Sequence, residues 1–136
     1  MKCVAITPEK TVFDQEVKFV VVPLYDGEYG VGANHSPVVG RLGVGELRLT
    51  LADKSMEHWY VEGGFVEVAN NVVTLLTNRA CKLQTLDLRE ARKEFADARA
   101  LPSNTPELTE IKIETVDRAR AKLRAAEKAR QLGLNK

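Results

Sequence analysis

The sequence predicts a β-sandwich of about ten antiparallel strands followed by a C-terminal α-helical hairpin. Residues 1–85 hold runs of Val, Ile, Thr, Phe and Tyr separated by turn-forming residues, a pattern typical of strands. The gaps between these runs are too short for crossover helices, so antiparallel pairing is expected. Residues 86–136 contain a single glycine, Gly133, and are dominated by Ala, Leu, Glu, Lys and Arg, which favour helices.

Strands are predicted wherever such a run spans at least four residues. Residues 46–51 alternate polar and apolar, as a half-buried strand does. Two polar segments, Ala52–Ser55 and Ala69–Val72, predict hairpin turns, because Asp and Asn tolerate left-handed backbone. In chain order, the predicted strands are 3–7, 11–15, 17–23, 29–32, 38–42, 46–52, 56–62, 64–69, 71–77 and 79–83.

Two helices are predicted, near 87–99 and near 106–132, with a proline-containing break between them. Thr105 is suited to cap the second helix, Pro106 fits its first turn, and Gly133 is a natural stop. The apolar stripes are thin and rich in alanine, so they bury little area, and we expect a marginally stable hairpin that can detach from the sandwich. The stripe residues are Leu88, Ala91, Phe95 and Ala98, then Leu108, Ile111, Val116, Ala119, Leu123 and Ala126.

Length and composition predict a soluble protein. The 136 residues suit one domain, or a small domain with an appendage, and the net charge of +1 gives no general attraction to nucleic acid or anionic lipid. The longest apolar run, residues 19–24, is too short to span a membrane. Signal- and transit-peptide patterns are lacking, which favours a reducing compartment where Cys3 and Cys81 stay buried thiols.

Charge is distributed unevenly along the chain. Residues 1–85 carry eight basic and ten acidic side chains, whereas residues 86–136 carry twelve and nine. In the second helix the acids come first and the bases last, which suits the helix dipole. An exposed basic helix end is equally able to dock an acidic partner. The basic residues are Arg118, Arg120, Lys122, Arg124, Lys128 and Arg130, and we call residues 118–130 the basic segment.

A glycine-rich segment, residues 27–37 with the sequence GEYGVGANHSP, resembles a site at first sight. No helix follows its glycines, as a dinucleotide fingerprint requires, and Ala33-Asn34 stands where a P-loop needs Lys and Ser or Thr. His35 and Ser36 are adjacent and point apart on an extended chain. The sequence shows no catalytic constellation, so we interpret the segment as a loop that displays polar groups to a partner.

Two other classes of function fit the sequence less well. A cupin-like metalloenzyme would need clustered ligands, but the chain has only His35 and His58 and no paired cysteine motif; neither a metal nor a cofactor is expected. A nucleic-acid binder could use the basic segment, yet an aromatic platform is lacking. No nucleic-acid partner is therefore expected.

Several motifs together resemble the epsilon subunit of the F-type rotary ATP synthase. Val22-Pro23 and Gly27–Val31 are followed by His35–Val39 and Gly45–Leu47, as in the family's signature. Val61–Val68, VEGGFVEV, is similar to a second family motif, and Leu86-Asp87 opens the helical region. The resemblance covers the whole chain in order.

This resemblance implies a non-catalytic rotor subunit of the central stalk, which couples proton-driven rotation of the c-ring to ATP synthesis. Its expected partners are the gamma subunit and the c-ring, with membrane association only through the complex. The expected location is peripheral, on the cytoplasmic face of the cell inner membrane. By position, the resemblance assigns docking to Glu28, Tyr29, Gly30 and His35.

The resemblance also implies that the hairpin restrains ATP hydrolysis by contacting the beta, and alpha, subunits through Arg118, Arg120, Lys122, Arg124, Lys128 and Arg130. Two positions depart from the family pattern. Ala33 replaces a proline, which leaves the turn softer. Asp87 matches the start of an ATP-binding motif, but Glu90 stands where arginine is expected and would repel phosphate. Nucleotide binding is therefore not expected.

Overall fold

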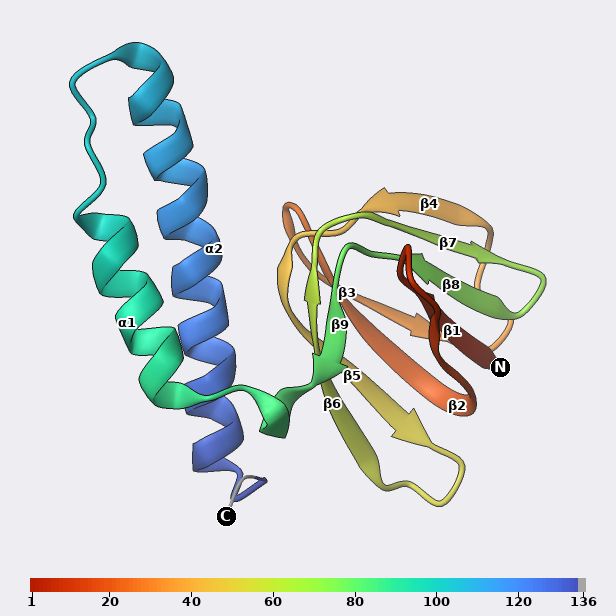
Figure 1. The fold of residues 1–136 in the computed structure, drawn as a ribbon. Coiled ribbons are helices and arrows are strands. Elements are labelled where there is room, and N and C mark those ends of the chain that lie inside the picture. The colour runs from red at the N-terminus through yellow and green to blue at the C-terminus, as the bar shows by residue number, and fades with distance from the viewer. Residues whose placement is uncertain (135–136) are drawn as a thin grey trace. The chain divides into compact units, whose positions relative to one another are not determined.

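The computed structural model describes residues 1–134 and divides into two compact units, Met1–Lys82 and a second that begins at Leu83. The first unit is built from strands and the second from helices (Figure 1). The last two residues of the predicted region 86–136 lie outside the described residues.

The first unit is a β-sandwich, as the sequence predicts. It has nine strands rather than ten, because the predicted strands 11–15 and 17–23 form one continuous strand, β2. The strands are β1 (Lys2–Ile6), β2 (Thr11–Leu24), β3 (Gly27–Gly32), β4 (Val38–Arg41), β5 (Val44–Leu51), β6 (Met56–Glu62), β7 (Phe65–Ala69), β8 (Val72–Leu76) and β9 (Ala80–Lys82).

Strand β2 belongs to both layers of the sandwich. Its first half pairs with β1 in a layer ordered β4-β7-β8-β1-β2, and its second half lies between β3 and β5 in a layer that continues through β6 to β9. The register with β5 shifts between Val17 and Phe19. A bulge of this kind bends a strand, so β2 passes from one layer to the other without ending.

The prediction of purely antiparallel pairing is wrong for one pair. Strand β1 runs parallel to β8, with Lys2 opposite Val72 and Ile6 opposite Leu76. Parallel neighbours need a long connection, and here the six strands β2–β7 supply it in place of a helix. The antiparallel prediction follows for strands that are neighbours in sequence. Strands β1 and β8 are far apart in the sequence of the first unit, so it does not apply to them.

The core lies between the two layers and follows the alternation of each strand. On β5, Leu47 and Leu49 are fully buried. The rings of Phe13 on β2 and Trp59 on β6 pack at a tilt, with centroids 4.6 Å apart. The Asn70-Asn71 turn between β7 and β8 has φ values of 54° and 63°, which fit the tight hairpin turn that the sequence predicts.

Cys3 is buried in this core, as predicted, while Cys81 on β9 is only partly buried. Burial raises the pKa of the Cys3 thiol from its ordinary value of 9.0 to about 12. The thiol form is therefore favoured in the folded protein, because the apolar surroundings disfavour the thiolate.

We expect Cys3 to resist thiol reagents until the sandwich unfolds. Only the thiolate reacts, so in a Cys81→Ser variant the labelling rate of folded protein at pH 8 should be at least about 100-fold below that of the urea-unfolded chain. Because the folded protein holds this proton more tightly than the unfolded chain, the free energy of unfolding that is linked to Cys3 is fully present below pH 9. It is lost as the pH rises toward 12. Rapid labelling of the folded variant would contradict the prediction.

The second unit holds a short 3-10 turn, Leu83–Thr85, and the two predicted helices, α1 (Leu88–Arg99) and α2 (Pro106–Gln131). Thr105 caps α2, since its hydroxyl accepts the Leu108 amide at 3.1 Å. Gly133 has a φ of 70°, and the Leu134 amide donates to the Ala129 carbonyl at 2.9 Å. This backbone arrangement ends α2 where the sequence predicts.

The fully buried residues of the two helices are all alanines. The stripe prediction is wrong for Ile111, whose side chain is 56% exposed. Ile113, which was not part of the stripe, is equally exposed. The helical period places Ile111 on the stripe, but α1 has only twelve residues and covers part of the 26-residue α2. The buried helical residues are Ala91, Ala98, Ala119, Ala125, Ala126 and Ala129.

Candidate functional site

The glycine-rich segment is a strand followed by a turn, not one displayed loop. Gly27–Gly32 forms β3, which pairs with the second half of β2. The chain turns at Ala33-Asn34, and His35–Pro37 leads into β4. Strand β3 confirms the predicted strand 29–32 and extends it back to Gly27. The interpretation of residues 27–32 as a displayed loop is wrong, because Val31 is completely buried and anchors β3 in the core.

This strand separates the predicted docking residues onto two faces. Side chains alternate along a strand, so Glu28 and Gly30 share the outer face of the layer. Tyr29 points the other way and packs against the core. The two faces have different partners. Tyr29 contacts His35, which is also a predicted docking residue, and Glu28 contacts Arg48 of β5, which is not.

Tyr29 and His35 hold the turn in place. The His35 Nδ1 lies 2.6 Å from the Ser36 carbonyl oxygen, which can only accept, so Nδ1 carries the proton in this contact. In the neutral ring Nε2 is then the acceptor for the Tyr29 hydroxyl at 2.9 Å. The two rings meet edge to face with centroids 5.5 Å apart. Both polar groups thus have partners within the segment itself.

A second contact fixes the tip of the turn. Asn34 has a φ of 60°, a left-handed conformation that asparagine tolerates. The backbone amide of Asn34 donates to the Asn71 side-chain oxygen at 2.8 Å. The turn after β3 is therefore tied to the β7–β8 hairpin.

A polar cluster that was not predicted from the sequence surrounds Glu28. Arg48 Nη1 lies 2.7 Å from Glu28 Oε2 and 3.1 Å from Glu46 Oε1. His58 Nδ1 lies 2.7 Å from Glu46 Oε2. The alternation of residues 46–51 indicates that Glu46 and Arg48 share a face, but only strand order places them near Glu28.

A side chain at Gly30 would meet the ring of Phe19, which can move, rather than backbone. A Cβ atom there would lie 2.8 Å from Cζ of Phe19, whose ring covers this part of β3. Phe19 remains 42% exposed. The ring therefore adds apolar surface to the outer face beside Glu28.

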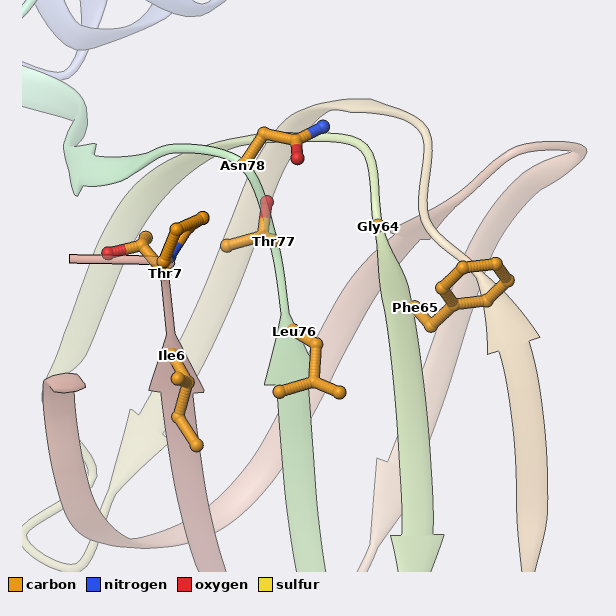
Figure 2. Close-up of a pocket in the computed structure, with 8 residues that line it drawn as sticks. Ile6, Thr7, Gly64, Phe65, Leu76, Thr77 and Asn78 are labelled. Carbon is orange, nitrogen blue, oxygen red and sulfur yellow. The ribbon is translucent and has the colours of Figure 1, made fainter. Parts of the chain in front are cut away.

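An exposed apolar face also lies on the first layer, on strands β4, β7 and β8. Val39, Phe65 and Leu76 are 70%, 58% and 53% exposed. Figure 2 shows Ile6, Leu76 and Phe65 beside one another at the end of their strands, where they line a hollow of about 370 Å³. Exposed apolar groups gathered in this way are typical of protein contacts. The Val61–Val68 motif contains Phe65, but it served only as a mark of family resemblance, so this face was not predicted from the sequence.

The basic segment is not uniformly available on α2. Lys122 Nζ contacts Glu94 of α1 at 2.9 Å, and the Arg120 guanidinium lies over the Phe95 ring at 5.6 Å. Arg118, Arg124 and Arg130 are exposed. Arg120, Arg124 and Lys128 recur every four residues, so they share a helix face. The structure thus engages Arg120 and Lys122 within the hairpin itself.

Asp87 acts as the cap of α1. Its carboxylate accepts the amides of Arg89 at 2.9 Å and Glu90 at 3.1 Å. Glu90 is exposed in the first turn, where its charge suits the helix dipole. The motif that resembled a nucleotide site is thus accounted for by helix capping.

Among residues 1–134, no three His, Cys, Asp or Glu side chains gather closely enough to hold a metal ion. None of the described helices has the length and apolar character needed to cross a bilayer.

Known proteins share both the sequence and the fold. Residues 1–83 match the family described as "ATP synthase, Delta/Epsilon chain, beta-sandwich domain". The ATP synthase epsilon chain of Rhodopirellula baltica is 46% identical over 126 residues, which cover 93% of this chain and 98% of that protein. The epsilon chain of Thermosynechococcus vestitus is 38% identical, over 89% of this chain and 91% of its own.

Solved structures agree in fold. A chain in the Euglena gracilis mitochondrial ATP synthase, in a structure of OSCP, F1 and the c-ring, aligns with a TM-score of 0.81. The match has 24% identity and covers 91% of this chain and 79% of that one. With a family match over the sandwich and close relatives along nearly the full length, the protein belongs to the family of ATP synthase epsilon chains.

Proposed function

We propose that this epsilon chain serves as a non-catalytic subunit of the central stalk of ATP synthase. In this role it rotates with the gamma subunit and the c-ring, and couples proton-driven rotation to ATP synthesis. Family membership supports the role, and the single observation that carries it at the residue level is Glu28, an exposed carboxylate on a strand that is anchored at Val31.

The sandwich contributes the docking surface in this proposal. Glu28 and the backbone at Gly30 face outward from β3, and the Tyr29–His35 contact holds the adjoining turn. A carboxylate placed on a rigid scaffold favours a partner loop that carries cations or hydrogen-bond donors. The polar loops of the c-ring are the proposed partner of this strand, and gamma is the proposed partner of the sandwich as a whole.

The second unit contributes restraint of ATP hydrolysis. The basic segment carries six cationic side chains and one acidic one, so it suits an acidic surface on the beta subunit. The fully buried residues of the two helices are alanines, which bury little apolar area. This supports a hairpin that leaves its resting position at little cost in free energy. The chain would lie on the cytoplasmic face of the cell inner membrane and reach the membrane only through the complex.

Charge reversal on β3 tests the docking role. A full-length Glu28→Lys variant should bind isolated c-ring at least about tenfold more weakly than wild type, since a like charge would face the partner's cations. Binding to gamma should be retained. Surface plasmon resonance at fixed salt provides both measurements.

Glu9→Lys is the matched control, because Glu9 is exposed in the turn between β1 and β2 and undergoes the same change of charge. It should bind both partners like wild type. Equal c-ring binding by Glu28→Lys, Glu9→Lys and wild type would exclude β3 as the docking strand.

A further inference from the structure

We propose that Arg48, which lies outside the glycine-rich segment, is a positioning residue that holds Glu28 in the orientation used for docking. The inference rests on the proposed docking role of β3. It adds supporting residues on β5 and β6, two strands that the predicted site did not include.

The geometry places Arg48 across an intervening strand from Glu28. Val21 of β2 is opposite Gly30 on one side and Arg48 on the other, so the Arg48 side chain spans β2 on the outer face. Its Nη1 donates to Glu28 Oε2 at 2.7 Å. The Arg48 side chain is 24% exposed, compared with 55% for Glu28. The ion pair is therefore anchored at the arginine end.

Glu46 fixes the arginine in turn. The same Nη1 atom donates to Glu46 Oε1 at 3.1 Å, and the other oxygen of Glu46 contacts His58 Nδ1 at 2.7 Å. His58 is directly opposite Arg48 on β6. A continuous series of polar contacts therefore runs from β6 to β3 and ends at Glu28.

This arrangement prepares Glu28 for binding in two ways. Free glutamate side chains lose rotamer freedom when a partner orders them, and a contact that orders Glu28 beforehand removes part of that loss. Arg48 contacts Oε2, so Oε1 can accept a hydrogen bond from a partner. One guanidinium shared by two carboxylates leaves the group with net negative charge, which still attracts a cationic loop.

A double-mutant cycle on the full-length chain tests the inference. The variants are Glu28→Gln, Arg48→Gln and their combination, and the measurement is the dissociation constant for isolated c-ring. Glu28→Gln should weaken binding about tenfold. Arg48→Gln should weaken it about fivefold in the wild-type background but less than about twofold when residue 28 is already glutamine, because coupled residues are not additive.

Two further variants separate positioning from general stability. Arg48→Lys keeps the charge and should recover part of the affinity, although lysine lacks the planar fork. Lys2→Gln removes the comparable Lys2–Asp14 pair, 3.3 Å long, in the other layer and should bind like wild type. Thermal unfolding of each variant checks that the sandwich remains folded.

The outcomes distinguish this inference from the proposed function. If Glu28→Gln binds like wild type, β3 is not the docking strand, and both proposals fail. If Glu28→Gln binds weakly but Arg48→Gln has the same effect in both backgrounds, or none, docking stands and the positioning role of Arg48 is overturned.

Discussion

Replacing Gly64 with alanine is expected to destabilise the sandwich by at least about 3 kcal/mol, the typical scale of severe single substitutions. Gly64 has a φ of 103°, where residues with a Cβ are strained. A Cβ atom at this position would lie 1.9 Å from the Leu76 carbonyl oxygen and 2.8 Å from the Thr77 Cα. Both contacts are with backbone, so a change of side-chain rotamer cannot relieve them.

Urea unfolding followed by Trp59 fluorescence measures this effect. Gly45→Ala is the matched control, because its added Cβ would lie 3.6 Å from the Pro23 Cβ, an ordinary contact. We expect the control to change the free energy of unfolding by less than about 1 kcal/mol. Similar midpoints for the two variants would show that the backbone at Gly64 and at the end of β8 moves apart freely.

Neutralising Arg118, Arg124 and Arg130 to glutamine is expected to raise ATP hydrolysis by the assembled ATP synthase several-fold. These three side chains are exposed, so an acidic surface can reach them. Each lost contact with a carboxylate should weaken the restraining interaction by about 1 kcal/mol or more. A loss of that size reduces the restrained fraction of the complexes several-fold. A coupled assay of ADP release measures the rate.

The same number of charges can be removed from α1 as a control. Arg89, Arg92 and Lys93 are exposed on that helix, and their replacement by glutamine should leave the hydrolysis rate near wild type. An unchanged rate in the α2 variant would reject the restraining role of the basic segment. Equal increases in both variants would indicate a general charge effect rather than a specific contact.

Local chemistry in the sequence predicted the elements that depend on neighbouring residues. The Thr105 cap, the Pro106 start and the Gly133 stop of α2 involve groups within a few positions of one another. The Asn70-Asn71 turn follows from the tolerance of asparagine for positive φ. Composition separated the strands of the first unit from the helices of the second, and the family motifs identified the protein's relatives.

The site was predicted less completely, because its contacts join residues that are distant in the sequence. The motif located Glu28, Tyr29 and His35, and the adjacent Tyr29–His35 pair lies within one segment. Alternation then separates Tyr29 from Glu28. Nothing local in the sequence links Glu28 with Arg48, since that contact depends on β2 lying between β3 and β5.

The sequence by itself therefore determined which segments form strands and helices, where the helices end, and which family the chain resembles. Tertiary structure alone decided that β2 continues through a bulge into both layers, that β1 and β8 run parallel, and that Arg48 contacts Glu28. Propensities and caps act over a few residues. Strand order is set by burying the apolar faces of both layers together, which requires the whole first unit.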